Sequence, residues 1–216
     1  MKEKILEAIK NVRAGAEKRN FKQSFDLCLN FKFLDTKKAE NKIKREILLP
    51  HSTGKDVFIG IMAEALIPKV NELNDKNVIL IRREEIEQLS RKKREMKKLA
   101  AKCKVFLSEP ALMLSVGKFL GPFLAPRGKM PKPIPPTLTT LKPLIESYRK
   151  TARLAVKDSP VAHCTVGVED MDDSKIADNI ETIINAMVAA LPKGKDNFRD
   201  AYLKLTMSKG VKIKVF

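Results

Sequence analysis

The densest group of charged side chains in the sequence is a basic run, RKKREMKKLAAKCK, at residues 91–104. It holds eight basic residues and one acid. On a helix, steps of three and four place four of these cations on one face: Arg91, Arg94, Lys98 and Lys102. Such a row binds phosphates and displaces their counterions. A solvated helix face has the same composition, so both interpretations stay open.

A second candidate is the segment LPHSTGKD at residues 49–56, which has some features of a phosphate-binding loop. It lacks the glycine that a P-loop carries five positions before Gly54. Asp56 also follows Lys55 where Ser or Thr would hold magnesium. We therefore expect no nucleotide hydrolysis here and interpret His51 as a turn or hinge residue.

His163 and Cys164 are neighbours, but successive side chains of a strand point to opposite faces, so they cannot form a nucleophile pair. His163 remains a candidate for contacting a phosphate or ribose, beside a purely structural role. The acidic run at residues 169–173 lacks the ligand spacing of a calcium loop. It precedes a predicted helix, where acids favour the positive end of the helix dipole, so we interpret it as a helix cap.

The loop LGPFLAPRGKMPKP, residues 120–133, combines prolines and glycines with three cations and no acid. The prolines stiffen it, and Gly121 and Gly128 allow unusual backbone angles. Such a loop either presents backbone and charge to RNA or packs on neighbouring helices. Its cations are Arg127, Lys129 and Lys132.

The end segments of the chain must position some of these residues. A helical stripe over residues 5–16 is followed by an alternation of apolar and polar residues that predicts a strand from Phe21 to Phe33 with one wet face. Near the other end, residues 153–157 and 161–169 are expected to form a hairpin around Ser159 and Pro160. A helix over 174–191 and strands over 201–207 and 211–215 follow.

The middle of the chain alternates strands and helices, as in a doubly wound parallel sheet. Strands are expected at 57–61, 78–81 and 105–107, with helices at about 64–73 and 84–102. Eight of the twelve prolines lie between residues 110 and 143, which leaves a short helix at 111–118, an ordered loop and a helix over 138–152.

The predicted fold class is therefore α/β with two domains. An α+β domain is formed by both chain ends, 1–61 and 152–216, and a Rossmann-like three-layer α/β domain, 62–151, is inserted into it. Two crossings near 61–63 and 150–153 would form a hinge. The inserted block carries 19 basic and 9 acidic side chains, and we expect it to hold the larger part of the charge.

Composition narrows the function classes. The chain has 43 Lys and Arg against 26 Asp and Glu, a formal charge of +17, which suits a polyanion such as nucleic acid. Its 44% of hydrophobic residues can bury a core. Three cysteines without common spacing imply neither a disulfide framework nor a zinc site. Charges interrupt every apolar run near the N-terminus, so we expect no signal peptide, no membrane span and a cytoplasmic protein.

The loop LGPFLAPRGKMPKP resembles the signature of the ribosomal protein L-one family, large-subunit proteins of the mobile stalk beside the tRNA exit site. Further similarities are the strand that starts near Phe21, the LPHSTGK turn, the segment around His163 and LKLTMSKG at residues 203–210. The resemblance covers essentially the whole chain and favours the shorter archaeal type.

This resemblance implies a structural, non-enzymatic protein of the cytoplasmic ribosome, monomeric off the ribosome and without cofactor, metal or catalytic residue. Its expected partners are large-subunit ribosomal RNA, exit-site tRNA, whose release it would assist, and its own mRNA, whose translation it would repress. The alternative that remains is a nucleotide-binding enzyme that uses the doubly wound domain. A general DNA-binding protein is a third possibility, with steeply salt-dependent affinity for any duplex.

The resemblance also places the RNA-binding residues on strands of the terminal domain. The residues matched by motif are Phe21, Ser24, Asp26, His163, Thr206, Met207 and Ser208, and charge and position add Lys22, Lys157 and Lys204. Three positions depart from the family pattern: Ala125 and Ser208 stand where the family usually has glycine, and Lys209 stands where it usually has proline. If that glycine needs a positive φ, Ser208 is strained.

Overall fold

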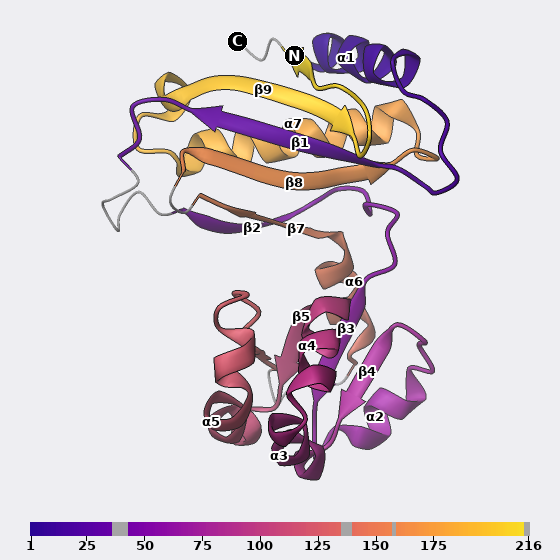
Figure 1. The fold of residues 1–216 in the computed structure, drawn as a ribbon, viewed down its shortest axis with the longest axis vertical. Coiled ribbons are helices and arrows are strands. Elements are labelled where there is room, and N and C mark those ends of the chain that lie inside the picture. Colours follow the sequence, from indigo (N-terminus) through magenta and orange to yellow (C-terminus); the bar gives the residue numbers. More distant parts are fainter. Residues whose placement is uncertain (36–42, 135–139, 157–158, 214–216) are drawn as a thin grey trace. The chain divides into compact units, whose positions relative to one another are not determined.

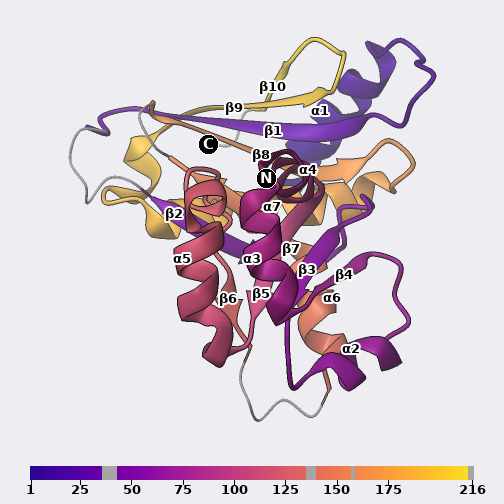
Figure 2. The ribbon, with the colours of Figure 1, turned by 60° about the horizontal axis from the view of Figure 1, so that its bottom comes forward.

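The computed structural model describes residues 1–35, 43–134, 140–156 and 159–213. By its internal contacts the chain divides into two compact units (Figures 1 and 2). One, the terminal unit, combines Met1–Lys55 with Arg149–Phe216, and the other, the central unit, is Asp56–Tyr148. Both ends of the chain thus contribute to one unit.

The terminal unit is built on a four-stranded antiparallel sheet. Its strands, in the order β10-β9-β1-β8, are β10 (Val211–Ile213), β9 (Phe198–Leu205), β1 (Ser24–Phe31) and β8 (Val161–Val168). Every second side chain of β1 is buried, as the alternation in the sequence predicts. One of the two inner strands, β1, therefore comes early in the sequence, and its two neighbours, β9 and β8, come late.

Two helices cover the apolar face of this sheet. They are α1 (Lys2–Ala14) and α7 (Asp173–Ala190), and their buried stripes join the sheet residues in one apolar cluster. A short ladder of β2 (Lys44–Leu48) and β7 (Thr151–Ala155) contributes to the same cluster. Figure 1 shows α7 running along one face of β1, β8 and β9. The side chains of the other face are polar or half-exposed, so this face is open within the unit.

Two predictions for the terminal unit are wrong. The alternation was expected to continue to Phe33, but β1 ends at Phe31, and Phe33 has a positive φ of 56°. The expected hairpin is also absent, because β7 pairs with β2 and β8 pairs with β1. Turn residues at 159 and 160 separate β7 from β8 but do not determine which strand each will meet.

The central unit has a parallel sheet in the order β4-β3-β5-β6. Its strands are β3 (Phe58–Met62), β4 (Val78–Ile81), β5 (Cys103–Ser108) and β6 (Lys132–Pro133). The helices are α2 (Ile67–Glu72), α3 (Arg83–Arg91), α4 (Lys93–Lys102), α5 (Met113–Leu124) and α6 (Lys142–Lys150), with 3-10 turns at Pro110–Leu112 and, in the terminal unit, Gly194–Asn197.

Helices pack on both faces of this parallel sheet. Met62 of β3 belongs to a cluster with side chains of α3, α4 and α5, whereas its neighbour Ile61 belongs to a cluster with side chains of α2 and α6. Successive strand residues point to opposite faces, so the two clusters are the two sides of a doubly wound sheet. The mixed α/β class predicted from the sequence is confirmed.

Two helices of the central unit differ from the prediction. The helix expected over 84–102 breaks at Lys92, so Arg91 lies on α3 while Arg94, Lys98 and Lys102 lie on α4. The row of four cations is therefore not continuous. In the proline-rich region, α5 continues through Pro122 to Leu124 because three side chains of its apolar stripe are buried: Val116, Leu120 and Leu124.

The charge is spread more evenly than expected. Residues 56–148 carry 17 basic and 10 acidic side chains, and the rest of the chain carries 26 and 16. The larger positive charge predicted for residues 62–151 depended on where the block was divided. The structural boundaries add Asp56 to the central unit and assign Arg149 and Lys150 to the terminal unit. Net charge therefore does not single out one unit as the nucleic-acid-binding part.

Candidate nucleic-acid interface

The open face of the terminal sheet brings together side chains from three strands. Asp26 on β1 lies opposite Thr165 on β8 and Lys204 on β9. The Thr165 hydroxyl donates to Asp26 Oδ1 at 2.8 Å. Asp26 thus fixes a hydroxyl and lies beside a cation, an arrangement suited to a ribose and its phosphate. The sequence prediction included Asp26 and Lys204 but missed Thr165, which only the register reveals.

One step along the same face, Cys28 lies opposite His163. The His163 Nδ1 and Cys28 Sγ atoms are 3.1 Å apart. Burial raises the pKa of the Cys28 thiol, so the sulfur stays protonated near neutral pH. The thiol accordingly helps to hold the exposed imidazole in place. The neighbouring Cys164 points into the core, and burial raises its pKa to about 12.

At the end of the sheet, a turn between β9 and β10 is tied to the start of β1. The Thr206 hydroxyl oxygen accepts the backbone N–H of Ser24 at 3.1 Å and lies 3.2 Å from the Ser24 hydroxyl. The Met207 N–H donates to Gln23 Oε1 at 3.2 Å. Ser24 is only 6% exposed. It therefore supports Thr206 from below and is largely shielded from solvent, and its expected contact with RNA stays a prediction.

Two exposed apolar side chains accompany this turn. Phe21, just before β1, is 50% exposed, and Met207 is 61% exposed. Lys22 pairs with Asp170 at 2.7 Å, with both side chains mainly in solvent. Exposed apolar groups beside a hydroxyl and a lysine give flat surface for a ribose or base. Phe21 lies outside the strand that was expected to carry it.

Ser208 closes the turn without strain. Its hydroxyl oxygen accepts the Leu205 N–H at 2.8 Å. Phe33 and Asn74 are the non-glycine residues with positive φ in the described part of the chain, so the departure from glycine at 208 needs no unusual backbone. Ala125 likewise has helical angles, with φ of −61°. Both departures are thus compatible with the fold.

The acidic run before α7 is held by Arg13. Its guanidinium bonds Asp173 Oδ1 at 2.8 Å and the carbonyls of Glu169 and Met171 at 2.6 and 2.7 Å. Asp172 pairs with Lys175, whose ammonium holds the pKa of that carboxyl below its usual value. The segment begins α7 as predicted, but Asp172 makes no side-chain capping bond.

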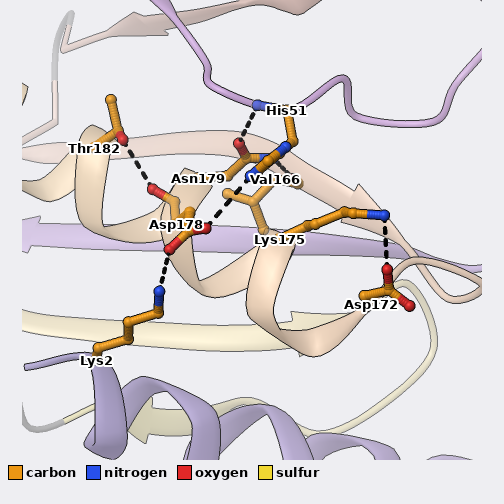
Figure 3. A network of polar contacts seen from close by, with 8 residues as sticks. All are labelled: Lys2, His51, Val166, Asp172, Lys175, Asp178, Asn179 and Thr182. Carbon is orange, nitrogen blue, oxygen red and sulfur yellow. Dashed lines mark hydrogen bonds and ion pairs between the residues drawn. The ribbon is translucent and has the colours of Figure 1, made fainter.

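The turn containing His51 is fixed to α7 within the terminal unit (Figure 3). Asn179 is fully buried; its Oδ1 accepts the His51 N–H at 3.1 Å, and its Nδ2 donates to the Val166 carbonyl at 2.9 Å. Asp178 bonds Lys2 Nζ at 2.6 Å and His51 Nε2 at 3.3 Å. The bond to Lys2 lowers the pKa of the Asp178 carboxyl. His51 is a turn residue, as the sequence suggested.

The basic loop of the central unit uses its cations internally. The Arg127 guanidinium donates to the Lys97 carbonyl at 2.9 Å, and Lys129 Nζ donates to the carbonyls of Ala100 and Cys103 at 2.8 and 2.7 Å. The Ala100 carbonyl belongs to the last turn of α4, so its bond to Lys129 satisfies one of the free carbonyls at that helix end. Lys132 Nζ lies 4.8 Å from the Tyr148 ring centre. Of the two roles considered for this loop, the structure shows packing on a helix. Lys157, predicted to bind RNA, lies outside the described residues.

The carboxyl edge of the parallel sheet, where doubly wound folds bind nucleotides, is filled by a buried side chain. The Glu109 carboxylate accepts the backbone N–H groups of Glu64, Ala65 and Leu66 at 3.1, 3.3 and 2.7 Å. Free backbone N–H groups before a helix can bind a phosphate, but these three are bonded to Glu109. A second anion cannot enter this position, which argues against the nucleotide-binding alternative.

Residues 1–35, 43–134, 140–156 and 159–213 contain no cluster of three or more His, Cys, Asp or Glu side chains able to hold a metal ion. Within the same ranges, no helix is long and apolar enough to cross a bilayer.

Comparison with known proteins places the chain in a family. Residues 10–209 match the profile of the Ribosomal protein L1p/L10e family. The large ribosomal subunit protein uL1 of Pyrococcus abyssi is 40% identical over 213 residues, which is 99% of this chain and 96% of that protein. That of Methanothermobacter thermautotrophicus is 39% identical over 216 residues, covering 99% and 100%. The chain therefore belongs to the ribosomal protein L1p/L10e family, as its proline-rich loop and LKLTMSKG segment indicate.

Proposed function

We propose that the chain binds large-subunit ribosomal RNA through the open face of its terminal sheet and the turn at residues 206–208. Membership of the family makes it a structural ribosomal protein of the large subunit and not an enzyme. The observation that carries the RNA proposal is that Ser24 holds the exposed Thr206, in a terminal unit where Phe21 and Met207 are also exposed.

The chemistry of this face suits structured RNA. Double-helical RNA hides its base edges in a deep groove, so proteins read its shape and its 2′-hydroxyls. The exposed Thr206 hydroxyl contacts the N–H, hydroxyl and carbonyl of Ser24 at 3.1, 3.2 and 3.5 Å. An RNA 2′-hydroxyl would replace the longest of these contacts. His163 and Lys204 offer polar and cationic groups to the backbone, and Asp26 orients Thr165. Recognition then depends on a few fixed groups rather than on total charge.

Binding of purified large-subunit ribosomal RNA by filter retention, with excess tRNA as competitor, tests the proposal. Thr206→Ala and Phe21→Ala should each weaken specific binding by about 1–3 kcal/mol, the size of a single recognition contact. Thr206→Ser keeps the hydroxyl and serves as the matched control. If both alanine variants bind as tightly as the parent, the interface lies elsewhere.

We propose three more specific functions because the chain belongs to this family. The chain would form the mobile stalk, with the two crossings between its units as the hinge, assist release of deacylated tRNA, and repress its own mRNA as a monomer. A reporter fused to the leader of the chain's own mRNA tests repression in a cell-free system. Added protein should lower reporter synthesis and Thr206→Ala should do so less; equal repression by both would separate this function from the open face.

A further inference from the structure

Phe33 is an exposed aromatic residue with a positive φ. The alternation of β1 would bury it beside Phe31, yet the ring is 78% exposed. The change of direction occurs at Phe33 itself, whose φ of 56° is in the left-handed region. Residues with a Cβ adopt this region at a cost in free energy, and Phe, unlike Asn or Asp, has no polar group to offset it.

The strained turn is held in place by a buried amide. The Asn197 side chain is 1% exposed; its Nδ2 donates to the Lys32 carbonyl at 3.0 Å and to the Phe33 carbonyl at 3.4 Å. Its Oδ1 accepts the Lys193 N–H at 2.7 Å, and the Lys32 N–H donates to the Asn197 carbonyl at 2.7 Å. Backbone strain that the surrounding hydrogen bonds hold in place is typical of functional positions.

The surroundings of the ring are cationic. Lys32 Nζ lies 5.6 Å from the ring centre. Within the described residues, neither Lys32 nor Lys193 pairs with a carboxylate, and both are exposed. Lys195 and Asp196 lie on the turn that contains Lys193, and Asp35 follows Phe33 two residues later. Three lysines against two aspartates leave a local excess of one positive charge. An exposed aromatic ring beside uncompensated ammonium groups matches an anionic, aromatic ligand better than an apolar protein surface.

We infer that Phe33 is a stacking platform for an unpaired nucleobase of the bound RNA, with Lys32 and Lys193 contacting the adjoining phosphates. The inference rests on the proposed function and adds a second contact at the other end of β1 from Thr206. Every base has a π face, so this contact needs no particular base and depends instead on a single-stranded nucleotide within reach.

The substitution Phe33→Gly distinguishes the effect of backbone strain on stability from the effect of the ring on RNA binding. Phe33→Gly removes the cost of the positive φ, so the melting temperature should stay equal or rise. Affinity for purified large-subunit ribosomal RNA should fall about 5- to 100-fold through loss of the stacked base. Phe33→Tyr, the matched control, keeps the ring and should bind like the parent. A glycine variant that is as stable as the parent and binds RNA equally well overturns the inference.

The chain contains no tryptophan, so Phe33→Trp supplies the only tryptophan, at the proposed contact, and its emission can be excited selectively. A stacked nucleobase should quench its emission on addition of the ribosomal RNA. Leu114→Trp is the control, since Leu114 is 87% exposed on α5, and its emission should change little. Unchanged emission at position 33 under saturating RNA, or equal quenching at both positions, contradicts stacking.

Three outcomes distinguish an error in the Phe33 contact from an error in the proposed RNA-binding face. If Thr206→Ala weakens RNA binding and Phe33→Gly does not, the open face is correct and the Phe33 contact is wrong. If Phe33→Gly binds naked RNA normally but no longer co-sediments with large subunits, the ring contacts a ribosomal protein, and the nucleobase assignment is overturned. If the parent chain does not retain the RNA, both proposals fail.

Discussion

The two units each contain a four-stranded sheet, but they cover it differently. In the terminal unit, helices pack on one face of an antiparallel sheet and leave polar side chains of three strands on the other. In the central unit, helices pack on both faces of a parallel sheet. At the carboxyl edge of this sheet, three backbone N–H groups are bonded to Glu109.

The difference in how helices cover the two sheets is a better guide to the RNA-binding unit than the net charge of each unit. Both units are basic to a similar degree, with 26 against 16 and 17 against 10 charged side chains. Charge attracts a polyanion to either unit, whereas fixed hydrogen-bonding groups on an accessible surface can recognise one. We therefore expect substitutions in the terminal unit to change RNA specificity and substitutions in the central unit to change mainly its own stability.

The largest effect is expected at Gly54 in the terminal unit. Its φ is 71°, and a Cβ there would lie 2.6 Å from Val168 Cγ2 on β8. Gly54→Ala should cost about 3 kcal/mol of unfolding free energy through backbone strain and overpacking, and RNA affinity should fall as the sheet is displaced. Urea unfolding and filter binding measure the two quantities. Gly117→Ala on α5, where a Cβ meets no atom, is the control; equal effects at both sites would contradict the comparison.

The next effect is expected in the central unit. Glu109→Ala removes the acceptor of three backbone N–H groups and should cost about 2 kcal/mol. RNA affinity should remain that of the parent at temperatures where the variant is folded. Glu109→Gln keeps one acceptor oxygen and should lose less. A drop in RNA affinity in the folded alanine variant would show that the central unit takes part in recognition.

A smaller effect concerns pH. The bond to Lys2 lowers the pKa of Asp178 in the folded chain, so this carboxylate contributes stability above its ordinary pKa, near 4. That contribution is lost as pH falls through the lowered folded value. Asp178→Asn should therefore be less stable than the parent at pH 7, and the difference should vanish in acid. Thermal melts between pH 2 and 7 would show it; a difference that does not depend on pH would mean that packing, not charge, is lost.

The smallest effect is expected on the exposed face of α4. Lys98→Gln should change affinity for ribosomal RNA less than about twofold and lower the slope of log affinity against log salt by at most about one. Lys204→Gln, on the open face, should cost more. Should the two substitutions prove equivalent, long-range charge rather than position determines the contribution of a lysine.

Periodicity predicted the parts of the fold that depend on local sequence. The stripe of Ile176, Ile180 and Ile183 marked α7, and the alternation from Phe25 to Phe31 marked β1, because each pattern reports one buried face. Patterns could not predict which strands pair. Thus the contact of Cys28 with His163, and that of Thr165 with Asp26, had no signal in the sequence.

Other departures came from single residues that override a pattern. A change of backbone angle at Lys92 ends α3, and one at Phe33 reverses the direction of a side chain. The site residues matched by motif lie together on the terminal unit, but the motif did not reveal that Ser24 is buried support for Thr206. Solvent exposure of a polar residue depends on its neighbours in space.

The order of the strands in the sequence also determines when the terminal unit can fold during synthesis. A ribosome makes β1 within the first 31 residues, but its partners β8 and β9 emerge only with residues 161–205, and Thr206 follows. The central unit is complete by residue 148 and is able to fold while the chain is still being made. The face proposed to bind RNA therefore cannot exist on an unfinished chain, so incomplete products of translation should not compete with the full-length protein for its RNA.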